Sequence, residues 1–322
     1  MNCPTCQKEA RKSGKNRNGS QRYLCAECNK KFTDESTRPT DRRDLDNDKA
    51  IMVLRMLLEG SSVRSIERLT QVHRDTIIGL LVDAGQACER FLESTVKNVP
   101  VEDVQADEIW GFVNCKEKTK VMHGYDDSVG DAWCFVAMER NSKLVLCWHM
   151  DKRSVPATRT FSAKLKAATA GKFQLSTDGF APYRTAMWDT FGPGIDFAQL
   201  VKVYGNPTEG GTAARYSPGE VIETHTVVCI GRPDEENVCT SHAERQNLTM
   251  RMTMRRLTRL TNAHSKKWDN HRAMLALYFA YYNFCRDHTT LHERNGKKCT
   301  PAMESGLADR VWTVGELLQN AV

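Results

Sequence analysis

The chain has 322 residues, of which 40% are hydrophobic and 27% charged, and its formal net charge is +6. This composition is ordinary for a soluble globular protein, and the length suffices for two or three domains. No apolar run reaches the roughly 18 residues that span a bilayer, and the start Met-Asn-Cys-Pro lacks a signal-peptide core. We therefore expect a cytoplasmic protein without membrane contact, whose twelve cysteines serve as metal ligands or buried thiols rather than disulfides.

Four cysteines near the N-terminus have the spacing of a zinc ribbon. Cys3 and Cys6 form one CxxC pair, and Cys25 and Cys28 form a second after eighteen intervening residues. Each pair turns two thiolates toward one point, and a hairpin between the pairs completes a tetrahedral site for one structural Zn²⁺. Lysines and arginines surround the pairs, so residues 1–35 are expected to be a zinc ribbon that touches nucleic acid.

A linker at 36–47 precedes a helical pattern at 48–97. An apolar helix ends at Gly60, a short helix follows from Val63 to Leu69, and a longer one runs from about His73 to Phe91. This order is typical of a helix-turn-helix module, whose last helix would offer Arg74, Asp75 and Thr76 to a DNA major groove. A plain three-helix connector is the alternative.

From residue 101 the pattern changes to that of an α/β domain. We expect strands at 101–113, 132–138, 143–149, 173–176 and 197–203, the last of the sheet, and helices at 154–170 and 181–191. Three sequential strands followed by alternating helices and strands predict a mixed sheet with an antiparallel start and a parallel continuation. Asp107 lies on the first strand and Asp178 at the carboxyl end of the fourth, where the strand ends form a crevice.

A basic helix beginning near Ser241 supplies a third carboxylate, Glu244. Residues 241–300 hold twelve Lys and Arg against four Asp and Glu, which indicates a surface for a phosphate backbone. On a helical wheel, Asn247, Arg251 and Arg255 share the face of Glu244, while Met250, Met254, Leu257 and Leu260 point to the core. The residues expected to bind DNA from this segment are Arg245, Asn247, Arg251, Arg255, Arg256 and Arg259.

Three carboxylates delivered by two strands and a helix are suited to a two-metal site that acts on phosphodiesters. We expect Asp107, Asp178 and Glu244 to hold two Mg²⁺ or Mn²⁺ ions. Glu108 falls on the opposite face of a regular strand from Asp107 and is left outside this triad.

The CxxC pairs, the helix-turn-helix, Asp107-Glu-Ile-Trp, Thr-Asp178-Gly and Glu244-Arg-Gln-Asn together resemble the insertion-sequence-one family of bacterial DDE transposases. The strings from Arg251 to Asn262 and from Tyr281 to His288 are similar to the C-terminal region of that family. The resemblance implies a ribonuclease-H-like core, magnesium dependence and Asp107, Asp178 and Glu244 as the catalytic triad, and the family repeats the glutamate at Glu108.

We interpret the chain as a transposase that binds the terminal inverted repeats of its own element and acts as a homo-oligomer on DNA. It would cleave a strand and join the freed 3′-hydroxyl to target DNA. The catalytic domain would span 101–290, with an insertion at about 205–240 of unknown role, and residues 291–322 would form a C-terminal tail. Two alternatives are a ribonuclease-H-fold nuclease that cuts without joining and a DNA-binding repressor with an inactive nuclease fold.

Overall fold

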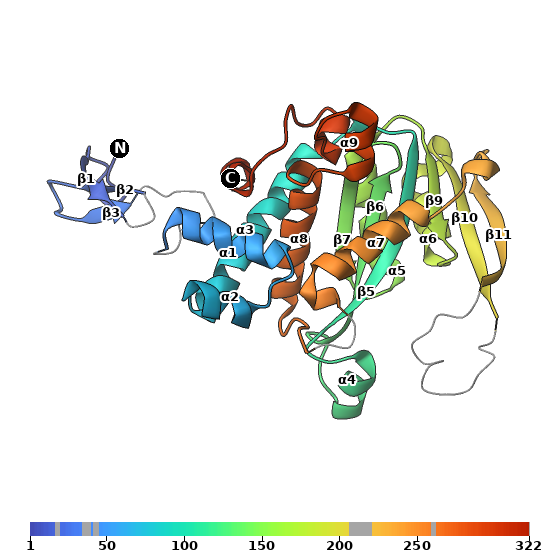
Figure 1. The fold of residues 1–322 in the computed structure, drawn as a ribbon, viewed down its shortest axis with the longest axis horizontal. Helices are drawn as coiled ribbons and strands as arrows, with labels where there is room; N and C mark the ends of the chain where they lie inside the picture. The colour runs from blue at the N-terminus through green and yellow to red at the C-terminus, as the bar shows by residue number, and fades with distance from the viewer. Residues whose placement is uncertain (17–19, 34–39, 41–44, 206–220, 259–261, 322) are drawn as a thin grey trace.

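The computed structural model describes residues 1–16, 20–33, 40, 45–205, 221–258 and 262–321 (Figure 1). A six-stranded mixed sheet with helices on both faces forms the main α/β body. A small three-stranded sheet and three helices precede it along the chain. The mixed α/β class expected from the sequence is therefore confirmed.

The N-terminal sheet has very little apolar material. Its antiparallel strands are β1 (Arg11–Lys15), β2 (Gln21–Leu24) and β3 (Lys31–Thr33). The buried hydrophobic residues of this part are Cys3, Ala10 and Cys25, and Tyr23 stacks on Phe32 with ring centroids 5.7 Å apart. So small a core stabilises a fold only with an additional constraint such as a bound metal.

The three expected helices follow as α1 (Asn47–Leu58), α2 (Val63–Thr70) and α3 (Arg74–Thr95). Gly60 has a φ of 77°, the left-handed backbone that ends α1 and that glycine adopts without strain. Ser62 caps α2, because its Oγ accepts a hydrogen bond from the amide of Ser65 at 3.1 Å. Gln71, also left-handed, ends α2 and starts the turn into α3.

Helix α3 continues past the turn and packs along α8 (Trp268–Phe284), so it joins the helical segment to the main body. The two helices touch at Gly85, where an added Cβ would lie 2.3 Å from the carbonyl oxygen of Ala273. Arg272 of α8 donates to the carboxylate of Glu89 at 2.7, 3.0 and 3.1 Å. The orientation of α3 is therefore fixed against the sheet domain.

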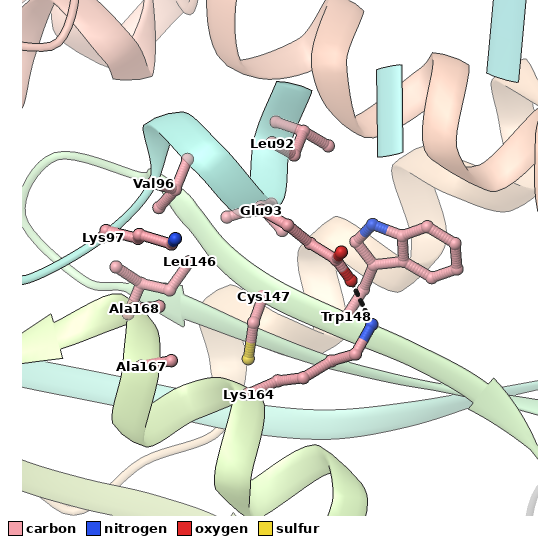
Figure 2. Close-up of a pocket in the computed structure, with 11 residues that line it drawn as sticks. Leu92, Glu93, Val96, Lys97, Leu146, Cys147, Trp148, Lys164, Ala167 and Ala168 are labelled. Carbon is pink, nitrogen blue, oxygen red and sulfur yellow. Dashed lines mark hydrogen bonds and ion pairs between the residues drawn. The ribbon is translucent and has the colours of Figure 1, made fainter. Parts of the chain in front are cut away.

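The C-terminal end of α3 also reaches the edge of the sheet. There it forms a cavity of about 290 Å³ with β7 (Val145–Asp151) and α5 (Val155–Ala168) (Figure 2). Lys164 of α5 crosses this cavity to Glu93 of α3 at 2.7 Å.

The strand order of the large sheet is β11-β10-β9-β5-β6-β7. Its remaining strands are β5 (Asp103–Val113), β6 (Gly130–Glu139), β9 (Gln174–Asp178), β10 (Asp196–Tyr204) and β11 (Val221–Ile230). Strands β5, β6 and β7 pair antiparallel, whereas β5, β9 and β10 pair parallel, as the sequence predicts. Strand β10 is not the last one, however, because β11 pairs antiparallel with it. That expectation was wrong, because β11 is mostly exposed and lacks the apolar alternation of a half-buried strand.

Helices α7 (Ser241–Thr253) and α8 lie across one face of this sheet, and α5 and α6 (Pro182–Phe191) cover the other (Figure 1). Helix α4 (Glu117–His123) projects from the connection between β5 and β6 (Figure 1). The C-terminal segment contains α9 (Thr289–Asn295), α10 (Pro301–Glu304) and α11 (Val314–Asn320), and α11 packs against α1, α3 and α8. The short elements are β4 (Val99–Pro100), β8 (Thr169–Ala170), η1 (Gly192–Gly194), η2 (Glu235–Asn237) and η3 (Arg255–Leu257). Among the described helices, none has both the length and the apolar composition needed to cross a membrane.

Candidate functional site

Two of the predicted carboxylates meet where β5 and β9 run side by side. The parallel register pairs Ala106 with Thr177, so Asp107 and Asp178 follow as the next residues on the two strands. A carboxylate oxygen of each lies within 4.8 Å of the other and of an oxygen of Glu108. The fold thus brings together side chains that are 71 residues apart in the sequence.

Asp107 is held by two hydrogen bonds. Its Oδ1 accepts from the backbone amide of Glu108 at 2.8 Å, and its Oδ2 accepts from the Nδ2 of Asn247 in α7 at 2.8 Å. Burial, reinforced by the negative charges of Asp178 and Glu244, raises the pKa of Asp107 to about 6. The site therefore carries more negative charge than its own hydrogen bonds neutralise.

Asp178 ends β9 and is fixed by the turn that follows. Its Oδ1 accepts from the amide of Phe180 at 3.0 Å. The Nε2 of Gln199, on β10, donates to the carbonyl oxygens of Asp178 and Phe180 at 2.8 and 3.1 Å. The Nε of Arg184 in turn donates to Gln199 at 2.6 Å, so the turn has little freedom to move. The side chain of Asp178 remains 39% exposed and can reach a substrate.

Glu108 lies beside these carboxylates although it was left outside the predicted triad. It points to the α6 face, as strand alternation predicts, and its side chain is only 2% exposed. Arg153, just after β7, contacts Glu108 at 3.2 Å and Asp178 at 3.5 Å, and so links the two faces of the sheet beside the end of β9. Burial, followed by the charge of Asp178, raises the pKa of Glu108 to about 7. The Tyr183 hydroxyl lies near this carboxylate, but within the described structure neither it nor Glu108 Oε1 has a partner in hydrogen-bond geometry.

A contact between β5 and the start of α7 places Glu244 on the Asp107 side of the sheet, close enough for its charge to act on Asp107. Gln105 lies two residues before Asp107 on the same side of β5, and its Oε1 accepts from the amides of His242 and Ala243 at 2.9 and 3.3 Å. These bonds satisfy amides of the first turn of α7 and set the helix on the strand. Gln105 is not among the site residues predicted from the sequence.

The Glu244 carboxylate is held apart from the other three. It forms an ion pair with Lys202 of β10 and accepts a hydrogen bond from Thr240 at 2.6 Å. Burial alone would raise its pKa, but the hydrogen bonds from Lys202 and Thr240 lower it overall. The described group of mutually close carboxylates consists of Asp107, Glu108 and Asp178, and Glu244 is outside it. At 45% exposure, Glu244 is as open to solvent as Asp178.

The arginines of this segment have different environments. Arg245 and Arg255 are exposed, whereas Arg251 is half-buried and its guanidinium donates to the carbonyl oxygen of Leu257 at 3.3 Å. Helix α7 ends at Thr253, so the helical wheel does not extend to Arg255, which lies in η3. Met250, Met254 and Leu257 are buried as predicted. Arg259 and Leu260 lie outside the described residues.

Arg256 is placed differently from the prediction. Its guanidinium donates to Ser265 Oγ at 3.2 Å and to the carbonyl oxygen of Asn270 at 2.9 Å. Burial lowers its pKa to about 10. These contacts give Arg256 a structural role between η3 and α8 and make it a poor DNA ligand, which the sequence could not show.

The start of α3 presents the residues expected to face DNA. Arg74 and Asp75 are exposed and Thr76 is partly exposed. The amide of Arg74 donates to Glu67 of α2 at 2.9 Å, which fixes the angle between the two helices.

The N-terminal cysteines converge as the spacing predicts. The Sγ atoms of Cys3, Cys6, Cys25 and Cys28 all lie within 4.8 Å of one another. Individual Sγ–Sγ distances are 3.5 Å between Cys3 and Cys28 and 3.4 Å between Cys6 and Cys25. The set could bind one zinc ion.

No known family model matches the chain, and no curated protein matches it in sequence. Among solved structures, the chain is similar to a piggyBac transposase in a synaptic complex with hairpin DNA, at 9% identity and a TM-score of 0.38. That match covers 89% of this chain and 72% of the other. A second similarity is to an endonuclease V from Bacillus subtilis, at 13% identity and a TM-score of 0.22, over 64% of this chain and 91% of the other. Both similarities are weak.

Proposed function

We propose that the chain is a DNA transposase that cleaves and joins phosphodiesters with divalent metal ions held by Asp107, Asp178 and Glu244. The observation that carries this proposal is the charge balance of the site. Asp107, Glu108, Asp178 and Glu244 face only two cationic side chains, Lys202 and Arg153, among the described contacts. This excess of hard oxygen donors fits Mg²⁺ or Mn²⁺.

Accessibility favours Glu244 over Glu108 as the third metal ligand. The Glu108 side chain is 2% exposed and lies between Arg153 and Tyr183, where a DNA strand has no access. Glu244 and Asp178 are 45% and 39% exposed, and both lie near Asp107. Lys202 would occupy part of the metal position through its ion pair with Glu244. We propose that Glu108 and Arg153 hold the middle of β5 against the carboxyl end of β9.

Two bound metal ions would activate an attacking oxygen and stabilise the leaving oxygen of an in-line displacement. Asn247 orients the Asp107 carboxylate, and the Gln199 contacts hold the Asp178 turn. Gln105 fixes the start of α7 and with it the position of Glu244. Each contact limits movement of an oxygen that must reach a defined position before reaction.

The arrangement of the sheet supports a ribonuclease-H-like catalytic domain at 101–290. Its first three strands are antiparallel, β9 then pairs parallel with β5 and β10 parallel with β9, and Asp107 and Asp178 lie on the adjacent strands β5 and β9. We further propose a zinc ribbon at 1–35 that binds one Zn²⁺ through Cys3, Cys6, Cys25 and Cys28, a linker at 36–47, and a helix-turn-helix module at 48–97. Residues 205–240 would be an insertion in the catalytic domain and 291–322 a C-terminal segment.

The substrates in this proposal are the double-stranded ends of an insertion element and a target duplex, bound by a homo-oligomer. Arg74, Asp75 and Thr76 would read bases, and Arg245, Arg251 and Arg255 would lie along the backbone. We propose that the chain is a transposase of the insertion-sequence-one type. The test is to incubate the protein and Mg²⁺ with a labelled duplex taken from DNA flanking its gene. We expect nicked and joined products. Nicks without joining would indicate a nuclease, and binding without nicks a repressor.

A further inference from the structure

A second charged cavity lies on the side of α7 turned away from the carboxylates. Its volume is about 270 Å³, and its walls come from α7, the turn between β6 and β7, and the loop after α8. It is lined by three basic side chains, Lys143, Arg245 and Arg286, and by one carboxylate, Asp287. None of these residues belongs to the proposed metal site.

The carboxylate in this cavity does not neutralise the cations. Asp287 accepts a hydrogen bond from the amide of Cys299 at 2.9 Å and contacts His292 Nδ1 at 2.7 Å. Within the described part of the chain, no carboxylate oxygen lies within 4.0 Å of a side-chain nitrogen of Lys143, Arg245 or Arg286. The cavity therefore retains a net positive charge.

The excess positive charge of the cavity is unusual because one of the cations, Lys143, belongs to a residue that is only 7% exposed. Its φ of 62° places it in the left-handed turn between β6 and β7. Its ammonium donates to the carbonyl oxygen of Arg140 and lies 3.4 Å from Nδ1 of His242. The nearby Glu139 carboxylate already accepts hydrogen bonds from the amide and hydroxyl of Ser142. A buried ammonium without a direct carboxylate partner destabilises a fold unless an anion joins it.

The histidines of the cavity respond to the same positive potential. Burial, with the charges of Lys143 and Arg286, lowers the pKa of His288 to about 4. Burial and then Lys143 also lower the pKa of His242. Both rings are therefore neutral at pH 7, and Nδ1 of His288 has no hydrogen-bond partner in the described structure.

We infer that this cavity binds a backbone phosphate of a DNA strand that passes over α7 from the carboxylate site. The ligand is a phosphodiester held by Lys143, Arg245 and Arg286. This inference rests on the proposed function, since it places the phosphate on the same strand that is cleaved. The bound phosphate would thus lie across α7 from the scissile bond, and since a helix is about 10–12 Å across, the two would be a few nucleotides apart.

The size of the cavity agrees with part of a polymer. Pockets for whole small molecules usually measure roughly 300–1,000 Å³, whereas this one is smaller and has a polar lining. Guanidinium and ammonium groups bind phosphate through charge-assisted hydrogen bonds, and the planar guanidinium can donate two in parallel.

The experiment measures binding of a fluorescein-labelled duplex of arbitrary sequence by anisotropy across a salt series, in magnesium-free buffer. The variants are Lys143→Met and Arg286→Gln. The matched control is Arg159→Gln, because Arg159 is an exposed arginine on the opposite side of the sheet that pairs with Asp189 at 3.2 Å. Each cavity variant should weaken binding about tenfold and make the salt slope shallower by about one. The control should match wild type. The thermal midpoint of each unbound cavity variant should equal or exceed that of wild type, because a like charge is removed.

The outcomes distinguish failure of the proposed function from failure of the phosphate site alone. If wild type does not bind DNA, the proposed function fails and this inference fails with it. If wild type binds and both cavity variants keep its salt slope, only the phosphate site is refuted. Lower thermal midpoints in both variants would show that the cations have internal partners and would also overturn it. A further measurement uses inorganic phosphate. If phosphate raises the thermal midpoint of wild type while the cavity variants keep the salt dependence of DNA binding unchanged, the cavity binds a free anion instead of DNA.

Discussion

Replacing Asp107 by asparagine should stabilise the metal-free protein at neutral and alkaline pH. The change removes one negative charge from the cluster of Asp107, Glu108 and Asp178 and keeps the size of the side chain. Oδ1 can still accept from the Glu108 amide. The side-chain amide of Asn247 can rotate so that its Oδ1 accepts a hydrogen bond from the new side-chain amide nitrogen at position 107 of the variant. The Asn247 Oδ1 has no other partner among the described residues.

The magnitude follows from the proton affinity of Asp107. The ordinary pKa of an aspartate is about 3.8, and burial, with the charges of Asp178 and Glu244, raises that of Asp107 to about 6. Because one pKa unit corresponds to about 1.36 kcal/mol, ionising Asp107 lowers the free energy of unfolding by up to about 3 kcal/mol. With an unfolding entropy of about 2.1 cal/mol/K per residue, this is roughly 4 °C in the thermal midpoint if the chain unfolds as one unit.

The pH dependence has a defined sign. Since the folded-state pKa lies above the unfolded one, the contribution of Asp107 to stability is complete below about pH 4 and is lost as the pH rises through about 6. The advantage of the variant should therefore be largest near pH 8 and disappear near pH 4. Mg²⁺ should raise the thermal midpoint of wild type more at pH 8 than at pH 5, and should affect the variant less.

The assay is thermal unfolding followed by circular dichroism, with and without Mg²⁺, over this pH range. Arg159→Gln is again a suitable control, because it is remote from the carboxylates. A variant that is less stable than wild type at pH 8 would refute the reasoning. So would a Mg²⁺ effect that is equal in both proteins.

Other regions give further predictions. Cys25→Ser should reduce bound zinc from about one per chain to none and weaken DNA binding; elemental analysis checks this, and full binding by a zinc-free wild type would contradict it. Arg255→Ala should weaken binding to all DNA duplexes and reduce the slope of affinity against salt by about one. Arg74→Ala should instead reduce the binding free energy by about 1–3 kcal/mol on a duplex with the element end and leave binding to a scrambled duplex unchanged. Equal effects of Arg74→Ala on these two duplexes would count against base recognition. Lys202→Met should lower the Mg²⁺ dissociation constant about fivefold, because the pair is partly exposed and worth about 1 kcal/mol, as calorimetric titration would show. Gly85→Ala should destabilise the protein by roughly 1–3 kcal/mol through overpacking, although alanine favours helix; denaturant unfolding that shows a gain would refute the close packing.

The sequence predicts the meeting of Asp107 and Asp178 because both follow from strand geometry. Asp178 ends β9, whereas Asp107 lies in the middle of β5, and the parallel register places the two residues directly after the paired position Ala106–Thr177. Glu244 is also predictable as part of a basic helix, but its distance from the aspartates is not. That distance depends on Gln105, whose contact with the start of α7 joins residues 137 apart.

Other features could not be predicted because they depend on tertiary contacts. Strand alternation correctly places Glu108 on the far face, yet its long side chain reaches the strand end, where Arg153 joins it to Asp178. Arg256 looks like its exposed neighbour Arg255 in the sequence but is enclosed by α8. Lys202 is the single basic residue of β10, which is the one sign that could have identified it.

The most direct test of the central claim compares cleavage of a labelled element-end duplex in Mg²⁺ by Glu244→Gln and Glu108→Gln. Asp107→Asn and Asp178→Asn serve as references, and DNA binding is measured in parallel. We expect Glu244→Gln to abolish cleavage as completely as the two aspartate variants while binding is retained, and Glu108→Gln to keep measurable cleavage. Wild-type cleavage by Glu244→Gln, together with its loss in Glu108→Gln, would contradict the proposed triad and assign the third ligand to Glu108.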